Sequence, residues 1–157
     1  MIQRIQSLYL LLASMFYLLY SFFGFKYYSK GYFPHFNSYL EKMNLGDLSI
    51  NFYIITQSLP NVIAIICFVA IFLFKKRIMQ LRFSKIALYI SIFMSIYTVI
   101  YFSVTLDDLL IYIQSQFVEI LLYAAILNPF LSSLLIYLAI KNIKKDEKLV
   151  SGEGLIR

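Results

Sequence analysis

Four long segments of the chain contain no charged side chain, and they constrain the fold more than any other feature. These segments are Ile5–Phe25, Leu48–Phe74, Ile86–Leu106 and Ile120–Ile140. About 20 consecutive apolar residues cross the hydrocarbon layer of a bilayer as an α-helix. Because the lipid interior offers the backbone no hydrogen-bonding partner, each segment is expected to form a helix that satisfies its own backbone.

The composition supports the same interpretation. Hydrophobic residues make up 61% of the 157 residues and charged residues only 14%, whereas soluble domains average about 45–50% and about 25%. A chain this short cannot bury so much apolar surface in a soluble core, so soluble enzymes, nucleic-acid-binding proteins and disordered tails are excluded. We predict an all-α integral membrane protein, with one domain over residues 1–157 that forms a four-helix transmembrane bundle.

Lysine and arginine are distributed unevenly between the two sides of the predicted bundle. Eleven lie in the N-terminal residues, the loop 75–85 and the tail 141–157, whereas three lie in the loop between the first and second spans. Short loops with many basic residues remain in the cytoplasm. We therefore predict that both termini are cytoplasmic, and the net charge of +6 needs no nucleic-acid partner to explain it.

The first outer loop, residues 26–47, has two interpretations. Pro34 suits the first position of a helix and Gly46 suits its end, and apolar residues between them recur at helical spacing. These residues are Phe36, Tyr39, Leu40 and Met43. The pattern favours a short amphipathic helix in the membrane interface, and the alternative is an irregular aromatic loop that caps the bundle.

Groups that perform chemistry are scarce in this sequence. The predicted spans contain no Asp, Glu, Lys, Arg or His, which are the residues that usually mark a functional site inside a membrane. His35 is the only histidine and lies in the outer loop, and Cys67 is the only cysteine. Asp107 and Asp108 are interpreted as a solvated turn rather than a cation site. We predict no catalytic residue, cofactor or metal site, and a non-enzymatic protein.

Three amides form the most polar group inside the spans. Gln57 and Asn61 are four residues apart, so they share one face of the second span, and Asn128 lies in the fourth span. A proline accompanies each site and is expected to bend its helix. One hypothesis is a polar pocket between spans two and four. The favoured alternative is hydrogen bonding between helices.

Small residues recur every seven positions in three of the spans. A seven-residue period predicts close, left-handed packing of the helices, because small side chains let helices approach each other in lipid. The positions are Ser7, Ser14 and Ser21, then Ser84, Ser91, Thr98 and Thr105, and then Ala125, Ser132 and Ala139.

Three parts of the sequence have a distinctive pattern, and they are the N-terminal Met1–Ala13, the loop residues Arg77, Gln80, Leu81 and Arg82, and the tail Ala139–Val150. In these parts the chain resembles a family of short four-span inner-membrane proteins from Gram-negative bacteria, which is catalogued as a domain of unknown function. The last residues, Glu153–Arg157, depart from the family pattern. The resemblance implies four spans in the bacterial inner membrane and implies no activity.

The polar residues that resemble the family all fall on the predicted cytoplasmic face. They are Gln3, Arg4, Gln6, Arg77, Gln80, Arg82, Asp146 and Glu147. One hypothesis is a docking surface for a partner or an anionic lipid head group. The other is an internal clamp of ion pairs, in which Asp146 or Glu147 lies within salt-bridge distance of an arginine among Arg4, Arg77 and Arg82.

Two functions are compatible with this pattern. The favoured one is an accessory or scaffold subunit of an envelope complex, which docks through the cytoplasmic face. Its partners would be the lipid bilayer and a membrane protein or a second copy of the chain, without nucleic acid or cofactor. The alternative is a carrier of lipids or small molecules, or a lipid-modifying protein, that uses the pocket formed by Gln57, Asn61 and Asn128.

Overall fold

Helices form all the regular structure in the described part of the chain. The computed structural model describes residues 2–21, 46–112 and 116–150, and side chains within 5–21, 58–100, 102–103, 116–117 and 119–147. The elements are α1 (Ile2–Leu19), α4 (Gly46–Phe72), the 3₁₀ turn η2 (Leu73–Lys75), α5 (Arg77–Tyr112) and α6 (Gln116–Val150). Most of the proposed interfacial helix in the first outer loop lies outside these residues, but Gly46, which we expected at its end, instead begins α4. Asp107 and Asp108, which we expected in a turn, lie within α5.

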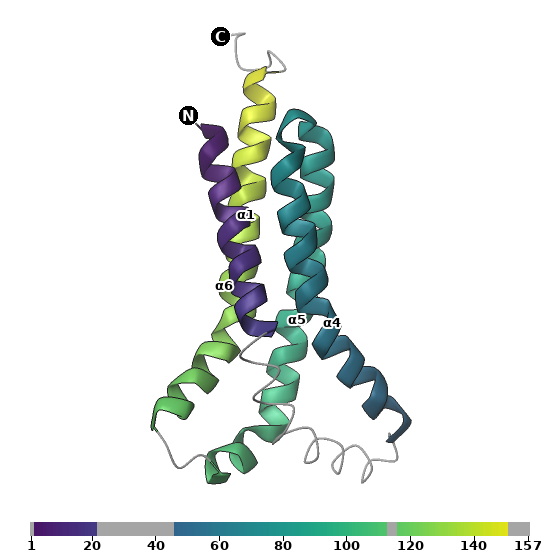
Figure 1. Ribbon diagram of the computed structural model, residues 1–157, viewed down its shortest axis with the longest axis vertical. Coiled ribbons are helices and arrows are strands. Elements are labelled where there is room, and N and C mark those ends of the chain that lie inside the picture. Colours follow the sequence, from purple (N-terminus) through teal and green to yellow (C-terminus); the bar gives the residue numbers. More distant parts are fainter. Residues whose placement is uncertain (1, 22–45, 113–115, 151–157) are drawn as a thin grey trace.

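The four helices pack side by side, and α1 and α5 each contact both α4 and α6. This arrangement places α4 and α6 diagonally across the assembly. Figure 1 shows that α1 begins and α6 ends at the same end as the turn between α4 and α5. Toward the other end, the start of α4, the end of α5 and the start of α6 spread apart.

Three of the helices are long and apolar enough to cross a membrane. Their apolar stretches are Ser58–Lys75, Arg77–Ile100 and Glu119–Glu147. The described apolar part of α1, Ile5–Leu19, is shorter, and a π-helical turn at residues 20–21 follows it. The remainder of the first predicted span, residues 22–25, lies outside the described part, so a fourth crossing stays a prediction.

The connection between α4 and α5 differs from the loop that we expected at residues 75–85. Only η2 and Lys76 separate the two helices, and α5 already begins at Arg77. The reason is a helical pattern of burial, since Gln80, Ser84 and Ala87 are buried whereas the residues between them are exposed or half-buried. This amphipathic pattern extends the helix beyond the uncharged segment.

Small and hydroxyl-bearing side chains fill the interior, as the seven-residue period predicts. Ser14, Ser84, Ser91, Thr98, Ala125, Ser132 and Ala139 are all buried, and Ser7 and Ser21 are half-buried. Larger side chains such as Leu10, Tyr17 and Met94 complete the core. We call the positions of the seven-residue period the packing stripe. The seven buried positions confirm that the stripe faces the interior, the left-handed packing stays a prediction, and Thr105 lies outside the described side chains.

Large apolar side chains dominate the outer surface. Examples are Tyr89 at 69% exposure, Ile65 at 60% and Leu127 at 64%. A soluble protein rarely presents such a continuous apolar surface to water. An apolar exterior around a hydroxyl-containing interior is instead what a lipid environment favours, because lipid tails solvate apolar side chains and leave polar groups to pair inside.

Several hydroxyls of the core have local or interhelical partners, whereas the buried Ser84 Oγ has none among the described residues. Tyr17 Oη in α1 and Ser91 Oγ in α5 share a hydrogen bond of 2.6 Å. Thr98 Oγ1 donates to the Met94 carbonyl at 2.8 Å, and Ser95 Oγ donates to the Ser91 carbonyl at 3.0 Å. The Tyr17–Ser91 contact therefore joins α1 to α5.

The buried stripe leads to a stability prediction. Ala139→Leu adds bulk at a completely buried position of α6, and overpacking of a filled core costs about 1–3 kcal/mol. Ala124→Leu makes the same change at an exposed position of α6 and is the matched control. Thermal unfolding in mild detergent should show a clear loss for Ala139→Leu alone. Equal melting temperatures for the two variants would contradict the packing stripe.

Candidate functional site

A buried polar cluster joins three helices at the end where α1 begins and α6 ends. The Gln6 amide of α1 donates a hydrogen bond to the Asp146 carboxylate of α6. Arg77 Nη1, at the start of α5, donates to the Asp146 backbone carbonyl at 3.0 Å. Gln6 is 4% exposed and Asp146 is 7% exposed. We call Gln6, Arg77 and Asp146 the end cluster.

The helices position this cluster for identifiable reasons. Asp146 is buried because α6 continues to Val150, far beyond the uncharged segment. On the same face of α6, Ile143 and Ala139 are also buried, so Asp146 extends the packing face by one more turn. A buried carboxylate needs hydrogen-bond donors, and Gln6 supplies one from the neighbouring helix α1.

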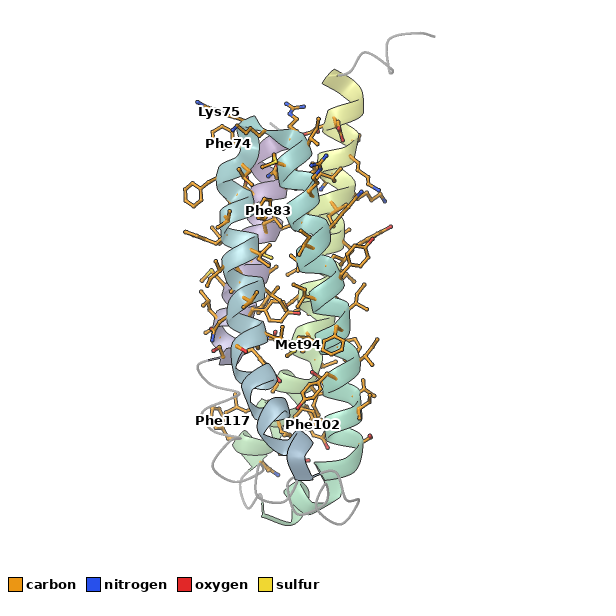
Figure 2. All side chains as sticks on the ribbon, turned by 90° about the vertical axis from the view of Figure 1, so that its right-hand side faces the viewer. Phe74, Lys75, Phe83, Met94, Phe102 and Phe117 are labelled. Carbon is orange, nitrogen blue, oxygen red and sulfur yellow. The ribbon has the colours of Figure 1, made fainter. Side chains whose placement is uncertain are left out.

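Exposed basic side chains lie at the same end of the helices as the end cluster. We call them the basic surface, and they are Lys75, Lys76, Arg82, Lys85, Lys141, Lys144 and Lys145. They lie on η2, at position 76 next to it, and on α5 and α6 at one end of the assembly, where Figure 2 shows Lys75 pointing away from the helices. Apart from Asp146 and Glu147, the acids of the described helices occur at the start of α4, the end of α5 and the start of α6, so most of the charge is separated along the long axis.

The predicted docking residues fall into different environments. Gln6, Gln80 and Asp146 are buried, Arg77 and Glu147 are half-buried, and Arg82 is exposed. The side chains of Gln3 and Arg4 lie outside the described ones. The structure brings Gln6, Arg77 and Asp146 together. Most of the accessible charge belongs to lysines that are not among the predicted docking residues, although the count of basic residues includes them.

The described contacts of Asp146 differ from the ion pairs of the predicted clamp. Arg77 contacts Asp146 through the backbone carbonyl of that residue, and the described partner of the carboxylate is the neutral Gln6 amide. Pairing of Asp146 or Glu147 with Arg4 or Arg82 stays a prediction. Sequence reasoning missed the Gln6–Asp146 contact because the two residues are 140 positions apart and one of them is uncharged.

The amides of the predicted polar pocket do not form one described group. Asn128 Nδ2 donates to the Phe16 carbonyl of α1 at 3.1 Å, and Ser132 Oγ donates to Asn128 Oδ1 at 3.2 Å. Asn61 is half-buried, and the side chain of Gln57 lies outside the described ones. The Asn128 contacts favour hydrogen bonding between helices over a pocket between α4 and α6.

A shallow groove of about 380 Å³ lies between α5 and α6. Apolar side chains line most of it, among them Ile92, Val99 and Phe130. Two serines also line it, but Ser95 and Ser133 donate their hydroxyls to carbonyls of their own helices. No group of three or more His, Cys, Asp or Glu that could hold a metal ion occurs among the described residues. The groove therefore offers an apolar surface.

The end cluster leads to a prediction that a double-mutant cycle measures. Gln6→Met removes the amide donor and leaves a buried acceptor unsatisfied, which costs about 1–3 kcal/mol. Adding Asp146→Leu removes that acceptor, so the double variant should lose less stability than the two single losses combined. Glu147→Gln is the control, because it removes a neighbouring charge and keeps the amide–carboxylate contact. Strictly additive losses in reversible unfolding would contradict a direct Gln6–Asp146 interaction.

Comparison with known proteins identifies a protein family that matches this chain. No curated protein and no solved structure matches this chain. The family match covers residues 2–152, which include all four described helices, the end cluster and the basic surface. It confirms the expected resemblance to a family of unknown function. The chain therefore belongs to the DUF4293 family, a domain of unknown function.

Proposed function

We propose that this protein is a four-span inner-membrane protein that works as a non-enzymatic accessory or scaffold subunit of a bacterial envelope complex. Its partner docks at the cytoplasmic end of the helices, on the α6 side of the basic surface. Three helices already have the length and apolarity of spans. The first helix completes the set, because the uncharged sequence continues beyond its described part to Phe25.

Charge supports the orientation. The basic surface lies at the end where α1 begins and α6 ends (Figure 1), and basic residues in short loops favour the cytoplasmic side. Asp47, Asp107, Asp108 and Glu119 belong to the opposite ends of α4, α5 and α6. With an even number of spans, both termini lie in the cytoplasm.

The observation on which a docking role rests is the end cluster. Its hydrogen bonds fix the start of α1, the start of α5 and the end of α6 to one another. Because the helix ends are held together, the lysines beside them present a defined arrangement of charge, which lowers the entropic cost of binding. Lys141, Lys144 and Lys145 are exposed on the part of α6 that extends past its uncharged segment.

The arrangement in the membrane is tested with fusion reporters. A cytoplasmically active reporter joined after Arg157 should be active, and a periplasmically active reporter inserted within residues 37–42 should be active as well. The physical reason is the excess of basic residues at one end of the helices. The two reporters exchanged between the same sites are the matched controls and should be silent. A periplasmic C-terminus would overturn both the orientation and the cytoplasmic docking face.

The docking role is tested by purification in a gentle detergent followed by mass spectrometry. A stoichiometric partner should be recovered repeatedly, and Lys144→Glu with Lys145→Glu should lower its recovery several-fold by reversing charge on the docking side. Lys26→Glu with Lys30→Glu makes the same charge change on the predicted outer side and should leave recovery unchanged. Recovery of a monomer that contains only bound lipid would reject the subunit role and favour a carrier.

A further inference from the structure

The tip of the hairpin between α4 and α5 exposes an unusual combination of side chains. We define the hairpin tip as residues 72–82, which include the end of α4, η2 and the start of α5. Its large apolar side chains are open to the surroundings, and they are Phe72 at 64% exposure, Phe74 at 48%, Ile78 at 60% and Met79 at 41%. Such a patch is unfavourable in water.

The same tip contains exposed positive charge and no acid. Lys75, Lys76 and Arg82 are exposed, and residues 72–82 include no Asp or Glu. Lys75 Nζ lies 6.0 Å from the centroid of the Phe74 ring. Figure 2 shows both of these side chains pointing outward at the end of the helices. Cationic and apolar groups therefore share one small outer surface.

The position of the hairpin tip along the helix axes indicates which layer of the bilayer surrounds it. The contact between Arg77 and the Asp146 carbonyl places the start of α5 beside residue 146 of α6. Residue 146 lies five residues beyond Lys141, the first charged residue after the fourth uncharged segment, which corresponds to about 7.5 Å along a helix. The polar head-group layer on each side of a bilayer is about 5–8 Å thick. The hairpin tip thus lies at the level of lipid head groups.

We propose that the hairpin tip is a binding site for an anionic phospholipid. Lys75, Lys76 and Arg82 contact the phosphate oxygens, and the apolar side chains of the tip contact the glycerol backbone and the first carbons of the acyl chains. This inference rests on the membrane arrangement of the proposed function. It assigns a lipid ligand to the basic residues of the hairpin tip, whereas the docking lysines of the basic surface belong to α6.

Charge alone does not define this site, because the end of α6 is equally basic. Lys141, Lys144 and Lys145 are exposed, but their described neighbours Asn142 and Ile143 are half-buried and buried. No apolar side chain is exposed among residues 141–147, and the nearest exposed one, Tyr137, lies one turn before Lys141. In the hairpin tip, exposed apolar side chains instead lie between the basic ones. The two groups of three basic residues allow a matched comparison.

The site is tested with the purified full chain in detergent, titrated with phosphatidylglycerol or phosphatidylcholine and measured by native mass spectrometry. The protein should retain phosphatidylglycerol preferentially. The variant Lys75→Gln, Lys76→Gln, Arg82→Gln should lose at least about tenfold in retained phosphatidylglycerol, because three basic contacts to an anionic head group are removed. The variant Lys141→Gln, Lys144→Gln, Lys145→Gln has the same net charge and should change retention less than twofold.

Further variants separate a lipid from a soluble anion and from a folding defect. Phe74→Ser with Ile78→Ser should weaken retention of phosphatidylglycerol, and free glycerol phosphate should not displace the lipid. Lys75→Arg with Lys76→Arg keeps the charge and should keep the binding.

Three results would overturn the site. They are equal losses in the two triple variants, no preference for phosphatidylglycerol, and displacement of the lipid by glycerol phosphate. Each concerns the purified chain alone, so each leaves a protein partner recovered from cells unaffected.

Discussion

The backbone of a membrane-crossing segment has no water with which to form hydrogen bonds, so every peptide group must be paired within the protein. This constraint makes each uncharged segment a helix along its length. The connection between α4 and α5 is short, because only η2 and Lys76 separate the two helices. Lys76 N–H donates a hydrogen bond to the Leu73 carbonyl at 2.8 Å where the chain reverses direction.

Once the backbone hydrogen bonds are formed, side-chain packing determines which faces of the helices contact each other. Lipid tails are as apolar as leucine, so helices in a membrane associate through close contact and interhelical hydrogen bonds rather than through exclusion of water. The interior follows this rule, since Ala87, Ala139 and Ser132 are completely buried and Tyr17 bonds to Ser91 across two helices. Asn128 belongs to the same scheme, because its amide donates to a carbonyl of α1 and thereby holds α6 against its neighbour.

The sequence predicts the parts of this fold that depend on local pattern. Uncharged segments locate the helices, and the seven-residue period locates buried positions such as Ser14 and Ser91. It does not predict contacts that depend on the register between helices. Gln6 and Asp146 meet only because α1 lies alongside the C-terminal part of α6 (Figure 1). The same holds for Arg77, whose partner is a backbone carbonyl that has no signature in the sequence.

The acidic residues near the end of α6 show how the register between helices determines what a side chain contacts. A positive tail would favour cytoplasmic orientation at least as well without them, since acids contribute little to that preference. Asp146 is buried against Gln6, so it connects helices instead of facing the lipid surface.

Burial of this acid has a second consequence. Because Asp146 is withdrawn from the surface, it competes less for the neighbouring lysines, and Lys144 and Lys145 remain exposed. The Gln6–Asp146 contact that stabilises the helix ends thus also leaves the positive charges of Lys144 and Lys145 exposed at that end.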